Sequence, residues 1–174
     1  DTFKNQFLSK GSEGVCGLVT GFNDLEVMDV DLKVFSTAQE RREWFKEYID
    51  FLDANITNFN DKFVIYMTKN EGYHILYKSK RVEGNLKVAK LKGHTQQVLE
   101  TRGVGGYVVV YDKSYNKKTY LDIDYISDED REVLFAVSRS YNVEEERIVS
   151  APKKKATDYK TQGLGAFEDY NNKT

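Results

Sequence analysis

The sequence contains one cysteine, one proline and two histidines in 174 residues. The single cysteine, Cys16, excludes an internal disulfide framework and a zinc site built from cysteines, and it fits a reducing cytoplasm. No apolar run approaches the roughly 20 residues that a membrane span needs, and no signal peptide opens the chain, so we expect no membrane partner. The first residue is Asp1 rather than methionine, so we expect the chain to be part of a longer protein.

Positive charge is not in excess, because the formal net charge is −2. Any contact with nucleic acid must therefore come from a local basic patch rather than from the field of the whole protein. The length suits one domain with a tail. Residues 143–174 are charged, poor in apolar side chains and contain the only proline, Pro152. We expect a folded domain over residues 1–142 and a linker over residues 143–174, toward a missing downstream region.

Residues 25–31, Leu-Glu-Val-Met-Asp-Val-Asp, have the pattern of a β-strand. Residues two apart on a strand share a face, so Asp29 and Asp31 are expected on the same side, with their Cα atoms about 6–7 Å apart. Two carboxylates this close repel each other unless a cation lies between them, and Mg²⁺ and Mn²⁺ prefer oxygen ligands. The alternative interpretation is a strand that ends in solvent with two ordinary surface acids.

The rest of the chain alternates short strands with two helices. Thr37 followed by Glu40 is a capping-box pattern that predicts a helix to about Asn55, and Ser127 followed by three acids predicts a second helix. The predicted order of elements indicates an α+β fold with a mostly antiparallel sheet and helices packed on one face. The first two predicted strands are expected to form a hairpin. Strands are predicted over residues 15–20, 25–31, 63–68, 73–78, 96–101, 107–111 and 117–123.

Two further side chains complement the acid pair, because His74 and Glu100 each lie in a predicted strand. If these strands neighbour one another in one sheet, both side chains converge with the acid pair on its open face. The carboxylates of Asp29, Asp31 and Glu100 would then hold two divalent metal ions, Mg²⁺ or Mn²⁺, that bridge a nucleoside triphosphate and an attacking 3′-hydroxyl. The alternative for His74 is a strand histidine with a structural role.

Basic side chains close to these positions suit phosphate oxygens. Lys78 shares a strand face with His74, and Arg102 lies two residues beyond Glu100. We therefore expect His74, Lys78 and Arg102 to bind phosphates and to stabilise the leaving pyrophosphate.

Residues 78–92 hold six basic residues and the single acid Glu83. Such a run is ordinarily a solvated loop, and its functional interpretation is an electrostatic footprint for nucleic acid. Under that interpretation the nucleic-acid-binding residues are Lys80, Arg81, Lys87, Lys90 and Lys92.

Three segments resemble motifs of the primase-polymerase (prim-pol) domains of phage and plasmid replication proteins, in the archaeo-eukaryotic primase superfamily. Residues 17–21 (Gly-Leu-Val-Thr-Gly) with residues 25–31 resemble the first motif, an acid-x-acid after a Val-Thr-Gly strand. Residues 72–77 (Gly-Tyr-His-Ile-Leu-Tyr) resemble the histidine motif. Residues 100–109 (Glu-Thr-Arg-Gly-Val-Gly-Gly-Tyr-Val-Val) resemble the third motif, and residues 84–89 (Gly-Asn-Leu-Lys-Val-Ala) a stretch often seen before it.

The resemblance spans about residues 15–142, and it implies an RRM-like fold core and a template-dependent nucleotidyltransferase, a DNA primase, a DNA polymerase or both. It assigns metal binding to Asp29, Asp31 and Glu100, and a nucleotide-phosphate contact to His74. The partners it implies are a single-stranded DNA template, NTP or dNTP and a fused or associated helicase, in a bacterial or phage-host cytoplasm.

Two other functions remain open from the residues. A metal-dependent nuclease would use Asp31, Glu100 and Arg102, although the strand has Glu-x-Arg where a common nuclease core has Glu-x-Lys. A non-catalytic single-strand-binding module would stack bases on tyrosines of an RRM-like sheet, and acids on that sheet would repel phosphates. Its stacking platforms would be Tyr73, Tyr77 and Tyr107.

Overall fold

A computed structural model describes residues 16–143. These residues form an α+β fold with a five-stranded antiparallel sheet and three α-helices, which confirms the predicted class. The elements are β1 (Gly17–Val19), η1 (Phe22–Asp24), β2 (Leu25–Val30), α2 (Ala38–Asn55), α3 (Phe59–Lys62), β3 (Val64–Met67), β4 (Tyr73–Lys78), β5 (Lys87–Ala89), β6 (Leu99–Arg102), β7 (Tyr107–Val109), η2 (Tyr120–Asp122) and α4 (Asp128–Ser140).

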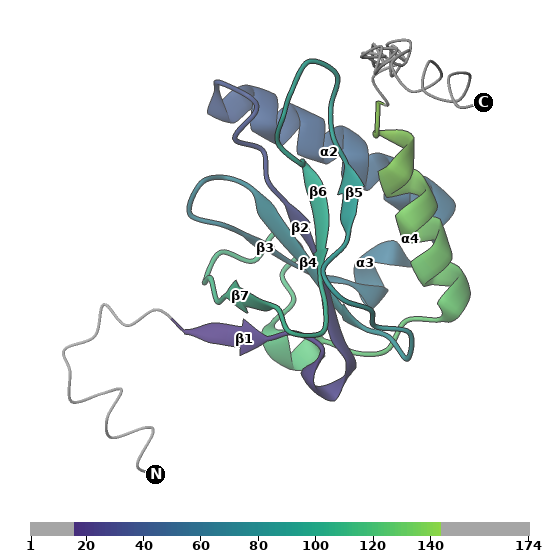
Figure 1. The fold of residues 1–174 in the computed structure, drawn as a ribbon. Helices are drawn as coiled ribbons and strands as arrows, with labels where there is room; N and C mark the ends of the chain where they lie inside the picture. Colours follow the sequence, from purple (N-terminus) through teal and green to yellow (C-terminus); the bar gives the residue numbers. More distant parts are fainter. Residues whose placement is uncertain (1–15, 144–174) are drawn as a thin grey trace, which may run out of the picture.

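The five-stranded sheet has the strand order β3-β4-β2-β6-β5, and every neighbouring pair is antiparallel. The strand with the acid pair, β2, is therefore the central strand, between β4 and β6. A separate two-stranded sheet pairs β1 with β7. Figure 1 shows α2, α3 and α4 on one side of the large sheet and β1 and β7 on its other side.

Each face of the large sheet packs against its own layer, as strand alternation requires. On the helix side, Met28 of β2 belongs to a buried cluster with Leu52 of α2 and Leu134 of α4. On the opposite side, Val27 belongs to a second cluster with Val108 of β7. The small sheet thus covers part of the face that sequence reasoning left open, and the candidate site lies beside this cover.

Both main helices begin as the sequence predicts. The side chain of Thr37 accepts a hydrogen bond from the backbone N–H of Glu40, and the Glu40 carboxylate accepts one from the backbone N–H of Thr37. The side chain of Ser127 accepts from the backbone N–H of Asp130 at the start of α4. These caps satisfy backbone donors that the first turn of a helix leaves without partners.

A buried ion pair fastens α4 to the centre of the sheet. Glu26 of β2 is fully buried, and Arg131 of α4 donates to both of its carboxylate oxygens, at 2.7 and 2.9 Å. The hydroxyl of Tyr77, on β4, donates to the same carboxylate at 2.9 Å. Because each buried charge has close partners, the pair is tolerated in an otherwise apolar layer.

The predicted hairpin between residues 15–20 and 25–31 is wrong, because β1 pairs with β7 in the small sheet. Between β1 and β2 the chain passes through a tight turn at η1, where Gly21, Asn23 and Asp24 have φ angles of 78°, 52° and 61°. Glycine, Asn and Asp are the residues that best tolerate this left-handed backbone. The turn leads from one sheet to the other instead of laying two strands side by side.

Other strand predictions differ from the structure in detail. The strand predicted over residues 117–123 is wrong, because the carboxylate of Asp122 accepts from the backbone N–H of Thr119 and closes the tight turn of η2. The strand predicted over residues 73–78 forms with these bounds as β4, and the other five predicted strands form with one or both ends shifted. Both β5 and α3 are missed by the sequence pattern, since three or four residues are too few to show a periodicity.

Within residues 16–143 no helix combines the length and apolarity needed to cross a bilayer. The predicted linker over residues 143–174 lies outside the described residues except for Val143, and so do residues 1–15 of the predicted domain.

Candidate functional site

A row of side chains crosses all five strands on the face opposite the helices. Asp29 on β2 lies directly opposite His74 on β4 and Glu100 on β6. The row continues to Tyr66 on β3, opposite His74, and to Lys87 on β5, opposite Glu100. Residues paired across antiparallel strands share a face and lie close together. The structure therefore brings Asp29, His74 and Glu100 together, as the sequence predicts.

Arg102 provides the positive charge of this cluster. Its Nε and Nη2 atoms donate to one carboxylate oxygen of Asp29, at 3.2 and 3.0 Å. Its Nη2 also lies 3.4 Å from a carboxylate oxygen of Glu100. Two acids on neighbouring strands would repel each other, and the guanidinium between them offsets that repulsion.

His74 is the most deeply buried side chain of the cluster, with 7% of its side chain exposed. Its Nε2 lies 3.8 Å from a carboxylate oxygen of Asp29, and its Nδ1 makes no hydrogen bond with any described residue. Burial lowers the pKa of His74 below its ordinary value of 6.5, the Asp29 carboxylate opposes this shift, and the Arg102 guanidinium adds to it. The imidazole is therefore neutral at pH 7.

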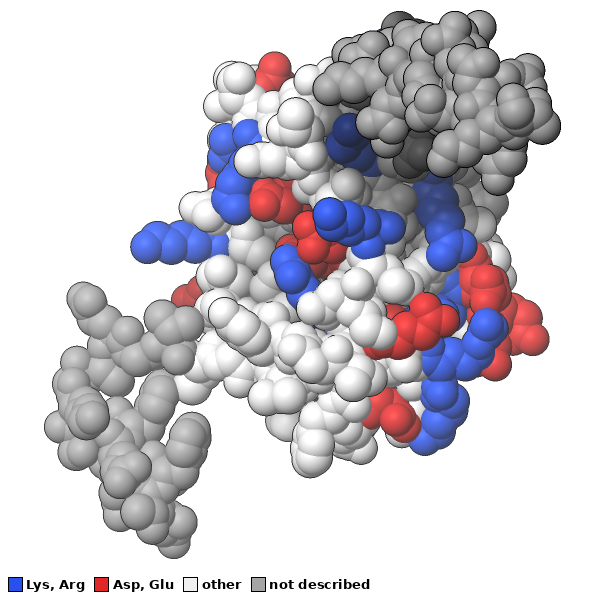
Figure 2. Space-filling model, in the orientation of Figure 1, with Lys and Arg blue, Asp and Glu red and all other residues white. Residues whose placement is uncertain are grey.

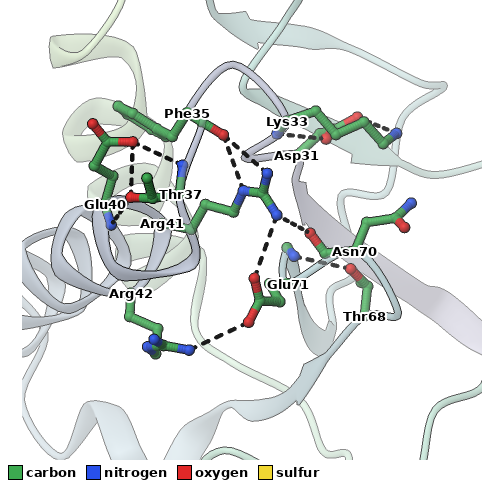
Figure 3. Close-up of polar contacts among 11 residues, drawn as sticks. Asp31, Lys33, Phe35, Thr37, Glu40, Arg41, Arg42, Thr68, Asn70 and Glu71 are labelled. Atoms are coloured by element: carbon green, nitrogen blue, oxygen red, sulfur yellow. Dashed lines mark hydrogen bonds and ion pairs between the residues drawn. The ribbon is translucent and has the colours of Figure 1, made fainter.

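Asp31 lies just beyond the end of β2, two residues after Asp29, and it does not line the pocket at that residue. Its backbone N–H donates to the carbonyl of Val98 at 2.9 Å, which continues the pairing with the chain before β6. Its carboxylate accepts from the backbone N–H and the Nζ of Lys33, at 3.2 and 2.9 Å (Figure 3). The Asp31 side chain is 40% exposed against 20% for Asp29. The two predicted acids thus have different cationic partners, Arg102 for Asp29 and Lys33 for Asp31.

Arg41 of α2 joins the loop after β2 to the turn between β3 and β4 (Figure 3). It donates to the carbonyl of Phe35 at 3.1 and 3.0 Å, to the carbonyl of Asn70 at 3.4 Å and to the carboxylate of Glu71 at 3.3 Å. The loop that carries the second acid and the turn that leads to the histidine strand are held against each other by this one side chain.

Steric crowding explains why a glycine, Gly72, precedes the strand that carries His74. A Cβ atom at this position would lie 2.4 Å from the carbonyl oxygen of Val30, closer than real Cβ contacts allow. The backbone N–H of Gly72 donates to the hydroxyl of Thr68 at 3.0 Å. The absence of a side chain thus lets the turn close on the end of β2, next to the acid pair.

A pocket of about 300 Å³ opens at the cluster, and Asp29, His74 and Arg102 line it. The sequence did not indicate the other residues that line this pocket, apart from Tyr107, which was proposed only as a stacking platform. The one local signal is the Gly-Asn dipeptide at residues 84–85, inside the stretch that resembles prim-pol sequences. The remaining lining residues are Asn85, Tyr107, Val108, Val109 and Tyr111.

Lys78 lies on the same sheet face as the cluster but at the far end of β4. It is paired with Leu25, four residues before Asp29 on β2, and it lines a different pocket, of about 490 Å³. Its Nζ lies 5.6 Å from the ring centre of Tyr125. The structure does not bring Lys78 to the pocket of Asp29.

The basic segment of residues 78–92 is less free than its sequence indicates. Lys80 forms an ion pair with Asp24 at 2.6 Å, and Arg81 forms one with Glu132 at 2.7 Å. Figure 2 accordingly shows basic and acidic side chains interspersed over this face of the molecule. Of the other three lysines predicted to bind nucleic acid, Lys87 and Lys92 are exposed and Lys90 is half-buried.

The chemistry of the donor set fits a hard divalent cation, because Asp29, Asp31 and Glu100 supply only carboxylate oxygens. Among the described residues, no group of three His, Cys, Asp or Glu side chains lies close enough together to hold a metal ion as arranged. The reason is visible in the ion pairs, since Arg102 lies between two of the acids and Lys33 holds the third. A metal ion bound by these acids would neutralise the carboxylate charges that Arg102 and Lys33 neutralise in this structure.

The tyrosines proposed as stacking platforms do not share one exposed surface. Tyr73 and Tyr77 are buried in the helix-side core, with 1% and 0% of their surface exposed. Tyr107, by contrast, is 71% exposed. The prediction that Tyr73 and Tyr77 stack on nucleic-acid bases is therefore wrong, because strand alternation turns both rings away from the face that carries the candidate site.

No protein-family model matches the chain, and no curated protein matches it.

Proposed function

We propose that this chain is a metal-dependent, template-directed nucleotidyltransferase of the primase-polymerase type. The observation that carries the proposal is the row across three adjacent strands, where Asp29 lies between His74 and Glu100 beside a pocket that Arg102 also lines. Asp29, the imidazole of His74 and the guanidinium of Arg102 line the pocket, and Glu100 lies next to Asp29 on the neighbouring strand. Carboxylates, an imidazole and a guanidinium are the groups that nucleotidyl transfer requires.

In the proposed reaction, the 3′-hydroxyl oxygen of a primer or first nucleotide forms a bond to the α-phosphorus of a nucleoside triphosphate. The bond from that phosphorus to the bridging oxygen breaks, pyrophosphate leaves with its electrons, and the hydroxyl proton passes to solvent. Divalent metal ions, when bound, would supply charge stabilisation at the phosphates. Asp29, Asp31 and Glu100 would hold these ions.

The protein's other groups would bind and orient the triphosphate. The Arg102 guanidinium presents a planar set of donors that matches phosphate oxygens, and it already lies in the pocket. His74 is neutral and buried, so it would donate a hydrogen bond to a phosphate oxygen without adding a charge. Lys78 lies at the far end of β4 and lines a different pocket, so it does not belong to the proposed phosphate-binding set.

The resemblance of three motifs to prim-pol domains supports the same proposal, because each motif contributes to the one row. Its first motif supplies Asp29, the second His74 and the third Glu100. These residues are 26 or more positions apart in sequence, and the register pairs Asp29 with His74 on one side and with Glu100 on the other. A single-stranded DNA template, NTP or dNTP, Mg²⁺ or Mn²⁺ and an associated helicase are the partners and cofactors that we propose with it.

The proposal is tested by incorporation of labelled nucleotides on primed and unprimed single-stranded templates with Mg²⁺ or Mn²⁺. We expect the wild-type chain to extend a primer and Asp29→Asn to reduce incorporation at least a hundredfold, because the substitution removes a metal ligand and keeps the shape of the side chain. Asp124→Asn is the control, since Asp124 is exposed and lies outside the pocket.

Three results would contradict the proposal: no incorporation by the wild-type chain, wild-type incorporation by Asp29→Asn, or cleavage of the template in place of extension. Cleavage would favour the nuclease alternative. Product on the unprimed template would add primase activity to polymerase activity.

A further inference from the structure

Asn85 lines the same pocket as Asp29, and a hydrogen bond to the backbone fixes the direction of its side-chain amide. It lies in the segment between β4 and β5, which carries no residue of the three motifs. Its carbonyl oxygen, Oδ1, accepts a hydrogen bond from the backbone N–H of Gly103 at 3.0 Å. Because the oxygen end of the amide is taken, the nitrogen end must point elsewhere.

The backbone around Gly103 is held on several sides, so the position of Asn85 is fixed by more than its own bond. The carbonyl of Gly103 accepts from the buried hydroxyl of Thr20 at 2.7 Å. The next N–H, of Val104, donates to the carbonyl of Glu83 at 2.7 Å. A Cβ atom at Gly103 would lie 2.0 Å from that same carbonyl oxygen. The turn after Arg102 and the segment before β5 are therefore packed as one rigid unit.

The amide nitrogen of Asn85, Nδ2, donates no hydrogen bond to any described residue. It belongs to a side chain that lines the same pocket as Arg102. Arg102 and Gly103 are adjacent in the chain, so the backbone that carries the guanidinium also anchors the amide of Asn85. Both are donors with no acceptor character at the atoms that they present.

We propose that Asn85 is a phosphate-binding residue, and that its Nδ2 donates to a phosphate oxygen of the nucleotide that Arg102 also binds. The inference rests on the proposed nucleotidyltransferase function. A phosphate oxygen is the ligand atom that both donors share, because it only accepts hydrogen bonds and carries the charge that the guanidinium requires. A sugar hydroxyl would need no cation beside the amide.

Three variants of the full chain separate the two ends of the amide. Asn85→Asp keeps an oxygen to accept from the Gly103 N–H, and replaces the donor with a negative charge. Asn85→Ala removes both ends. Thr20→Val removes the side-chain hydrogen bond to the Gly103 carbonyl without altering a residue of the pocket, so it measures the effect of loosening the turn alone.

The experiment is calorimetric titration of each variant with dATP and with inorganic triphosphate, in the presence of Mg²⁺. We expect affinity for both ligands to fall in the order wild type, Asn85→Ala, Asn85→Asp, with the Asp variant weaker than wild type by about tenfold or more, because a hydrogen bond to a charged group is removed and a repulsion is added. Thr20→Val should lower the unfolding temperature and keep the affinity for dATP within about twofold.

The order of affinities decides the inference. Asn85→Asp binding as tightly as wild type, or more tightly than Asn85→Ala, would show that the residue only anchors the turn and would overturn the proposal. If the Asn85 variants lost affinity for dATP but kept it for inorganic triphosphate, the amide would contact the sugar or base, and the proposal would be overturned. It would also be overturned if Thr20→Val lost as much affinity for dATP as the Asn85 variants do. A wild-type chain that binds no dATP would overturn the proposed function as well.

Discussion

Asp29 shows how much of the candidate site depends on the neighbours of one residue. It lies opposite His74 on one side and Glu100 on the other, and Arg102 donates to its carboxylate. Two acids side by side destabilise a sheet, whereas a guanidinium between them restores the balance of charge. The four side chains are therefore one electrostatic unit, and a change at any of them alters the others.

A residue-scale prediction concerns the glycine before the histidine strand. Gly72→Ala should lower the free energy of unfolding by about 1–3 kcal/mol, because the new Cβ meets the Val30 carbonyl and forces the end of β2 to move. The matched control is Gly84→Ala, since a Cβ at Gly84 meets no atom within 4 Å. Urea denaturation of both variants measures the difference. Equal stability of the two variants would mean that the turn has room to adjust.

At the scale of elements, the buried pair of Glu26 and Arg131 sets how α4 lies on the sheet. Arg131→Met should cost about 3–5 kcal/mol of unfolding free energy, because it leaves the Glu26 carboxylate buried without its cation. Arg139→Met on the same helix should cost less than about 1 kcal/mol, since Arg139 is exposed and its guanidinium packs on the ring of Phe135.

A second substitution checks the reason for that loss. Replacing both partners, with Glu26→Leu added to Arg131→Met, should recover most of the stability, because no uncompensated charge remains in the core. Urea denaturation of the wild-type chain, Arg131→Met, Arg139→Met and the double variant measures these differences in unfolding free energy. A double variant less stable than Arg131→Met alone would mean that the pair contributes more than mutual charge compensation.

At the scale of the whole molecule, charge is distributed rather than concentrated. The net charge is −2, and two of the basic residues predicted to contact nucleic acid are paired with acids. Figure 2 shows acidic atoms near the middle of the displayed face with basic side chains beside them. The proposed binding of nucleic acid would therefore depend mainly on basic residues outside these two ion pairs, such as Lys87 and Lys92.

We predict that Lys87→Gln with Lys92→Gln weakens binding of single-stranded DNA and reduces its salt dependence, by about 0.7 in the slope of log K against log salt for each phosphate that is no longer neutralised. Both side chains are exposed, and Lys87 lies beside Glu100 in the row across the sheet. Lys80→Gln with Arg81→Gln is the matched control, and its slope should change less. Fluorescence anisotropy over a salt series gives both slopes, and equal slopes in the two double variants would contradict the prediction.

The sequence by itself determined the local features of this protein. Strand alternation identified β2 and β4 and the residues that share their faces, and side-chain caps located the starts of α2 and α4. The predicted site residues Asp29, Asp31, His74 and Glu100 follow from residue type, spacing and motif, without any knowledge of which strands are neighbours. These signals are local, because a period of two or a cap needs only a few consecutive residues.

The tertiary structure alone decided what depends on contacts between distant segments. It placed β1 beside β7 instead of β2, put Arg102 between two acids, turned Asp31 toward Lys33 and brought Asn85 to the pocket. Turn geometry at η1, with three positive φ angles in four residues, redirected the chain in a way that no hydrophobic pattern records. Strand neighbours and ion-pair partners are chosen by the packing of the whole chain, so their identity is not written in any short stretch of it.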